Sequence, residues 1–119
     1  FMDKVPLGRL AERLVGETLE RRGYQLLDSN VRLGPLEIDL VAARGRTVVF
    51  CEVRARKLGS PVDPRFTFDH EKRRHVREAA ARYLATRRVA YDVVRLDAAA
   101  VWVDVERRRA RIRYFEDAL

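Results

Sequence analysis

The sequence predicts a single α/β domain in which a mixed central β-sheet is flanked by helices. Two observations carry this prediction. Two segments with helical periodicity, one near the N-terminus and one ending near Arg87, are separated by strand-like stretches. Those stretches either alternate apolar and polar residues or form short continuous apolar runs, which is typical of strands. No internal repeat or linker-like composition interrupts residues 1–119, so we expect one domain.

The first helix is expected over residues 7–22. Pro6 suits its start, and Gly23 is expected to cap its C-terminal end in a left-handed conformation. Glu12 lies at the edge of the apolar stripe, three positions before Val15, so its carboxylate can reach a site beside the sheet. An exposed position on a charged helix remains the alternative for Glu12.

Three strands are expected to follow as a meander. The first covers residues 24–33 and turns at Gly34-Pro35, and the second and third are joined by a turn at residues 44–46. Residues 48–51 form a continuous apolar run. This part of the third strand is therefore expected to be buried on both faces.

Three carboxylates lie where these hydrophobic strands come together. Period two places Glu37 and Asp39 on one face of the second strand, and Glu52 directly follows the apolar run. Buried carboxylates are costly to desolvate unless compensated, and Mg²⁺ prefers such hard oxygen ligands. We therefore predict that Asp39 and Glu52 bind magnesium, or manganese, and that Arg54 stabilises charge on a phosphoryl group. A solvated charged face is the alternative for each residue taken singly.

The spacing of Asp39, twelve intervening residues and Glu52-Val53-Arg54 resembles the PD-(D/E)XK signature of restriction-endonuclease-like nucleases. The whole chain is similar to the YraN-like uncharacterised protein family (UPF0102), predicted relatives of Holliday junction resolvases and restriction enzymes. The segments that carry this similarity are GRLAE (8–12), GY (23–24), NVR (30–32), EIDL (37–40), VFCEVRAR (49–56), Lys72 with its neighbouring arginines, YDVV (91–94) and FEDA (115–118).

The resemblance implies a restriction-endonuclease-like three-layer fold and a magnesium-dependent endonuclease that acts on DNA phosphodiester bonds, with branched or structured DNA as candidate substrates. It also implies a site in which Asp39 and Glu52 hold the metal and a glutamate of the first helix, Glu12, supports it. Arg54 completes the expected catalytic set by orienting the scissile phosphate. Glu37, on the same strand face as Asp39, is expected to support the ligands.

Three positions depart from the family pattern. Leu36 stands where Gly is usual, Arg54 where Lys is usual, and Ala90-Tyr91 where Arg-Phe is usual before Asp92. Arginine cannot lose a proton to act as a base, although it can clamp a phosphate with two hydrogen bonds. The residues therefore support metal binding more strongly than turnover.

A second helix is expected up to about Arg87, capped by Thr67 or Asp69. Lys72 lies four residues before Val76 of its apolar stripe, so we expect its side chain on the core side. A phosphate there would gain both the lysine charge and the helix dipole. The predicted nucleic-acid-binding residues are Arg56, Lys57, Lys72, Arg73, Arg74 and Arg77.

The C-terminal part is expected to form strands over residues 89–96 and 100–105, separated by a break at residues 97–99, and a last strand that ends at Phe115. Trp102 is assigned to sheet packing in preference to a base-stacking platform. The arginines between positions 107 and 113 either extend a phosphate-binding surface or protect an edge strand from aggregation.

The charge balance favours a polyanionic partner. The chain carries 25 Lys and Arg against 18 acidic residues, for a formal net charge of +7, so DNA is the first expected partner. The single Cys51 excludes an intramolecular disulfide and suits a reducing cytoplasm, and no segment has the pattern of a membrane span or signal peptide. Phe1 before Met2 is expected to be a cloning remnant.

Two other functions remain open on the sequence. One is a non-catalytic nucleic-acid-binding module of the same fold, which would bind DNA in the presence of a chelator and cut nothing. The other is a protein-interaction domain that binds an acidic protein partner. In that case DNA would not compete for the basic surface of this chain. A symmetric homodimer would suit branched DNA.

Overall fold

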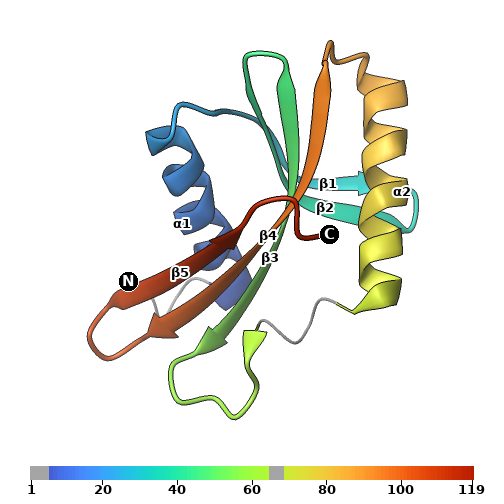
Figure 1. Cartoon of the computed structure of the whole chain (residues 1–119). Helices are drawn as coiled ribbons and strands as arrows, with labels where there is room; N and C mark the ends of the chain where they lie inside the picture. The colour runs from blue at the N-terminus through green and yellow to red at the C-terminus, as the bar shows by residue number, and fades with distance from the viewer. Residues whose placement is uncertain (1–5, 65–68) are drawn as a thin grey trace.

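Five strands form one mixed sheet between two helices (Figure 1). The computed structural model describes residues 6–64 and 69–119, so Phe1 and Thr67 lie outside the described residues. The strand order is β1-β2-β3-β4-β5; the β3–β4 pair is parallel and the other neighbours are antiparallel. The elements are α1 (Leu7–Arg21), β1 (Gln25–Leu33), β2 (Leu36–Arg44), β3 (Thr47–Lys57), α2 (His70–Arg87), β4 (Val93–Asp104) and β5 (Arg109–Phe115).

The two helices cover opposite faces of the sheet. Leu10, Val15 and Leu19 of α1 pack in one core cluster with β3 and β4 residues such as Cys51, while α2 packs in a second cluster that includes Phe50 of β3. The α/β class and the flanking of a mixed sheet by helices are therefore confirmed. Within the described residues, neither helix is long and apolar enough to cross a membrane.

Helix α1 ends at Arg21, one residue before the predicted end. Arg22 follows the last helical residue, and its backbone N–H bonds to carbonyls of the last turn. Gly23 then has a φ of 89°, a left-handed conformation that glycine adopts without a steric penalty.

The centre of the sheet is β3, whose apolar run is buried on both faces as predicted. Residues 48–51 are at most 1% exposed. Val49 and Cys51 point toward α1, and Val48 and Phe50 toward α2. Burial from both sides explains why this stretch is apolar without alternation.

The sheet forks between β2 and β3. Their antiparallel ladder ends at the pair Leu40–Cys51. Beyond it, the start of β2 stays paired with β1, and residues 52–57 of β3 stay paired with β4. In Figure 1 the start of β2 lies with β1 on the side of α2, whereas β3 and β4 run to the lower left and β5 returns from there beside β4.

Strand β4 is one continuous strand, so the predicted break at residues 97–99 is wrong. Asp97 is fully buried in the strand, where Arg95 donates to its carboxylate at 3.0 Å and the backbone N–H of Asp117 donates at 2.8 Å. The Tyr114 hydroxyl donates to the same carboxylate. Two of these partners lie 17 and 20 positions away, so the local sequence could not show that an aspartate is tolerated here.

Replacing Asp97 with alanine is expected to destabilise the fold by about 3–5 kcal/mol, because Arg95 and Tyr114 would lose the buried carboxylate that pairs them. The matched control is Asp92→Ala, which breaks the exposed Arg46–Asp92 ion pair at 2.7 Å and should cost at most about 1 kcal/mol. Urea unfolding measures both values. Equal losses in the two variants would contradict a structural role for the Asp97 network.

Candidate active site

The fork brings Asp39 and Glu52 together. Asp39 Oδ2 accepts a hydrogen bond from the backbone N–H of Val53 at 2.8 Å, so a side chain takes over where the β2–β3 backbone ladder stops. Glu52 is the first residue of β3 beyond the last pair. Both residues are buried, Asp39 at 8% and Glu52 at 1% exposed. Two carboxylates thus lie at a strand opening with little water to solvate them.

Two cations compensate this negative charge. Lys72 Nζ lies 2.9 Å from Glu52 Oε2, and Arg54 Nη2 lies 3.2 Å from the same oxygen. Arg54 Nη1 lies 3.8 Å from Asp39 Oδ2 and donates to the Val53 carbonyl at 3.1 Å. Both cations therefore lie against one buried carboxylate oxygen, and a metal ion at Glu52 would have to displace them or share that carboxylate with them.

The start of α2 aims Lys72 at the fork. The Asp69 side chain caps the helix by accepting from the Lys72 backbone N–H at 2.8 Å, which places Lys72 in the first turn. Val76, one turn later, is buried, so Lys72 shares the sheet-facing side of the helix. The sequence predicted this direction but assigned Lys72 to the DNA backbone; its contact with Glu52 depends on how α2 packs against β3.

Glu12 approaches the site from α1. Its Oε1 is buried and has no hydrogen-bond partner among the described residues, while the Asn30 side chain bonds to the carboxylate. Burial raises the pKa of Glu12, and the nearby charges of Asp39 and Glu37 raise it further. Glu37 is therefore close enough to the fork for its charge to act on Glu12 and Asp39.

Asn30, which the sequence names only as part of the NVR segment shared with the family, is a residue of the site. It has a φ of 51° inside β1, between the residues that pair with Leu40 and Ile38, and thus lies opposite Asp39. Non-glycine residues rarely adopt this conformation, and asparagine is among the few that tolerate it. The available signals were its side-chain type and its place in the NVR segment, since a left-handed residue inside a strand has no local sequence signature.

The residues fit a partial magnesium shell. No group of three or more Asp, Glu, His or Cys side chains within residues 6–64 and 69–119 is arranged to hold a metal ion. Mg²⁺ is commonly held by one or two carboxylates, with waters and substrate phosphates completing its octahedron. Asp39 and Glu52 provide two such carboxylates with hard oxygen ligands, and Lys72 and Arg54 neutralise them in this structure.

Burial and mutual repulsion shift the acid equilibria of both carboxylates. Burial, followed by the charge of Asp39, raises the pKa of Glu52 to about 7, against the opposing effect of Lys72 and Arg54. Burial also raises the pKa of Asp39, opposed mainly by the hydrogen bond from Val53. The site thus holds its ionised carboxylates at a cost to folding.

That cost predicts a pH-dependent stability. Because the folded pKa of Glu52 is raised from 4.5 to about 7, the folded state keeps a proton that the unfolded state loses between these values. Stability should therefore fall as pH rises through this window, by up to about 3 kcal/mol, and level off above it. Urea unfolding in chelator between pH 4 and 8 measures the fall, which Glu52→Gln should remove. Glu78→Gln, at an exposed carboxylate, should keep it, and a fall that survives Glu52→Gln would assign it to another group.

The other predicted nucleic-acid-binding residues divide into two groups. Arg56 follows Arg54 on the same face of β3 and donates to the Ala55 carbonyl at 2.7 Å, and Lys57 ends the strand. Arg73, Arg74 and Arg77 are exposed on α2, away from Lys72. The structure thus brings Lys72 to the fork, places Arg56 further along β3 opposite Trp102, and leaves the three α2 arginines exposed.

Comparison with known proteins finds one matching protein family and relatives that align over most of the chain. A sequence model of the uncharacterised protein family UPF0102 matches residues 11–101. A UPF0102 protein of Moorella thermoacetica is 37% identical over 111 residues, covering 93% of this chain and 92% of the relative. Another, from Alkaliphilus metalliredigens, is 32% identical over 112 residues, covering 94% and 96%. A third, from Geobacter metallireducens, is 36% identical over 95 residues, covering 80% and 78%.

Proposed function

We propose that this chain, which belongs to the uncharacterised protein family UPF0102, is a magnesium-dependent endonuclease that acts on DNA phosphodiester bonds. One observation carries the proposal: the sheet opens at the point where Asp39 and Glu52 lie buried beside Lys72 and Arg54. Two carboxylates that can hold a metal and two cations that can bind a phosphate form a set that can catalyse phosphodiester hydrolysis.

Asp39 and Glu52 would hold the metal, Mg²⁺ or alternatively Mn²⁺. When bound, the ion would lower the pKa of a coordinated water and stabilise negative charge on phosphate oxygens. Glu12 lies on the α1 side with one buried oxygen unsatisfied, which suits support through a water molecule. Glu37 adds negative charge that favours a cation at the fork.

Arg54 and Lys72 would contact the substrate. Arg54 reaches toward both carboxylates and can clamp a phosphate with two hydrogen bonds, which orients the scissile group. Lys72 lies closest to Glu52 and can place a charged ammonium beside the reacting oxygens. A bound metal would take over this compensation, so Lys72 would be able to turn toward the phosphate, while Arg54 keeps its hydrogen bond to the Val53 carbonyl.

Binding along the DNA would depend on the remaining cations. Arg56 and Lys57 continue from the fork, and Arg73, Arg74 and Arg77 add an outer basic surface. Phosphate contacts of this kind give salt-sensitive binding with little sequence preference. The proposal includes a cytoplasmic location, which suits the unpaired Cys51, and a homodimer for branched DNA that needs two cuts.

A non-catalytic DNA-binding module is the second candidate. The observation that favours it is that Lys72 and Arg54 can neutralise Glu52 by themselves. Such a cluster would be stable as a purely structural network. This candidate predicts DNA binding in chelator and no cleavage under any condition.

The test is cleavage of end-labelled duplex, single-stranded, flap and four-way-junction DNA with Mg²⁺, Mn²⁺ or chelator. The proposal expects cuts that need a divalent ion and that leave defined ends. DNA binding without cleavage of any of the four substrates would favour the non-catalytic module. Absence of DNA binding at low salt would leave the basic surface to an acidic protein partner.

A further inference from the structure

The lower part of the sheet extends away from α2. Helix α2 packs on residues such as Phe50 of β3 and Ala98 of β4. From there β3, β4 and β5 run on to the lower left in Figure 1, with the loop after β3 beside them. Val101 and Val103 of β4 are fully buried toward α1, as expected for sheet packing, whereas Trp102 between them faces the other side and is only half-buried.

Strand pairing sets the residues of this face in rows. Arg56 of β3 pairs with Trp102 of β4, which pairs with Arg111 of β5. The next row toward the fork is Arg54, Ala100 and Arg113. Paired residues of neighbouring strands project on the same face, about 5 Å apart between strands. Arginines therefore line a path from the Asp39/Glu52 fork to Trp102, and the small Ala100 leaves space along it.

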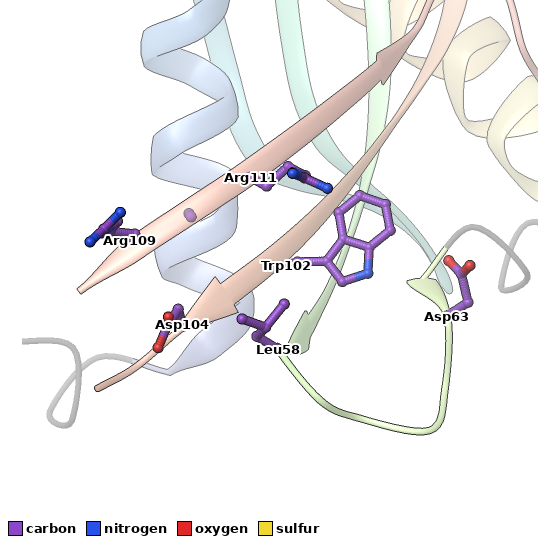
Figure 2. Close-up of a pocket in the computed structure, with 7 residues that line it drawn as sticks. Leu58, Asp63, Trp102, Asp104, Arg109 and Arg111 are labelled. Carbon is purple, nitrogen blue, oxygen red and sulfur yellow. The ribbon is translucent and has the colours of Figure 1, made fainter. Parts of the chain in front are cut away.

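Trp102 lies at a pocket of about 510 Å³ at the end of this path (Figure 2). Arg111 extends toward the indole from β5, and Leu58 and Asp63 close the pocket from the loop after β3. Arg109 and Asp104 lie further out, at the strand ends. The volume is that of a small-ligand site and is large enough for a nucleobase.

We propose that the Trp102 pocket receives an unpaired nucleobase of a DNA strand whose phosphates follow Arg54, Arg56 and Arg111 from the fork. This inference rests on the proposed function and deepens it, because it makes DNA with a single-stranded segment beside the cut the substrate class. A tryptophan among arginines is the combination with which proteins bind single strands: the ring stacks a base and the cations hold its backbone.

A paired base does not fit this arrangement. Bases inside a duplex are stacked on their neighbours and cannot present a face to a side chain without being extruded. Arg56, the neighbour of Trp102, comes four positions after Glu52 in β3, which is about 13 Å along a strand. The pocket would therefore hold a base a few nucleotides from the scissile phosphate, as in a flap or at a branch.

The chain offers a direct readout, because Trp102 is its single tryptophan. In chelator, where no metal-dependent cut can occur, a 12-nucleotide single strand should quench the indole emission. An abasic strand of the same length and charge should bind through its phosphates without comparable quenching. Trp102→Ala should lower the affinity for the base-bearing strand by about 5- to 100-fold and leave the affinity for the abasic strand unchanged. Trp102→Phe should give an intermediate affinity for the base-bearing strand.

The matched control is Tyr91→Ala. Tyr91 is an exposed aromatic residue near the other end of β4, so its removal should change neither affinity. Equal weakening of base-bearing and abasic strands by Trp102→Ala, or no quenching of the wild-type protein by the base-bearing strand, would overturn the inference. The comparison of the two strands on the wild-type protein stands even where Trp102→Ala fails to fold.

The binding and cleavage experiments can fail independently, so they test the base pocket and the endonuclease separately. Quenching and stacking without cleavage of any substrate would reject the endonuclease and keep the base pocket. Metal-dependent cleavage together with identical binding of base-bearing and abasic strands would keep the endonuclease and reject the pocket.

Discussion

Asp39→Asn and Glu52→Gln are each expected to lower metal-dependent DNA cleavage by at least about a thousand-fold. A bound metal supplies several kcal/mol of transition-state stabilisation, and each 1.36 kcal/mol is a factor of ten in rate. In Asp39→Asn, the amide oxygen can still accept the hydrogen bond from Val53, so the fork should keep its shape while losing the charge that holds the ion. Single-turnover cleavage with saturating protein measures the chemical step.

Stability separates this loss from simple unfolding. Glu52→Gln removes a buried carboxylate whose pKa is raised to about 7, so the variant should be as stable as the wild-type protein or more stable at pH 8. Activity and stability would then change in opposite directions, as at sites that are maintained for function. Asp92→Asn, an exposed aspartate near the far end of β4, is the matched control and should cleave normally. Retained cleavage in Asp39→Asn or Glu52→Gln would reject the metal site.

The sequence predicted those features of the site that local patterns determine. Glu52 directly follows an apolar run that had to be buried, and Asp39 sits in the neighbouring strand, so their meeting follows from a short hairpin. The direction of Lys72 followed from its spacing to Val76. Family membership, confirmed by the comparisons, supported the same arrangement.

Features that depend on long-range packing could not be predicted. Asp97 was predicted to lie in a turn because an aspartate interrupts the strand pattern. The partners that stabilise it inside the strand, Tyr114 and Asp117, come from the C-terminal end of the chain, so the local sequence does not show them. The ion pair between Lys72 and Glu52 depends on the docking of α2 against β3, and the exposure of Trp102 depends on where α2 stops covering the sheet. In each case the residue type fitted two environments, and only the tertiary structure decides between them.

Lys72 is expected to perform the role for which Arg54 is unsuited. Arginine stays protonated in proteins, so Arg54 can bind and orient a phosphate but cannot exchange a proton with the attacking water or leaving oxygen. Lys72 reaches the same carboxylate oxygen from α2, at 2.9 Å compared with 3.2 Å for Arg54. A lysine in this position can supply a mobile proton as well as charge. Helix α2 therefore provides, in Lys72, the lysine that is absent at position 54 of β3.

Lys72→Met is therefore expected to lower cleavage by about 100-fold or more, the usual contribution of a positioned acid–base group, while Arg54→Lys should stay within about tenfold of the wild-type rate. Lys72→Arg separates charge from proton transfer, because arginine keeps the positive charge but does not give up a proton to the reacting atoms. We expect its cleavage rate to be as low as that of Lys72→Met. Cleavage rates measured under single-turnover conditions, with DNA affinity measured in chelator, separate chemistry from binding. If Lys72→Met cleaves normally while Arg54→Met is inactive, the arginine is the essential cation and α2 contributes only to binding.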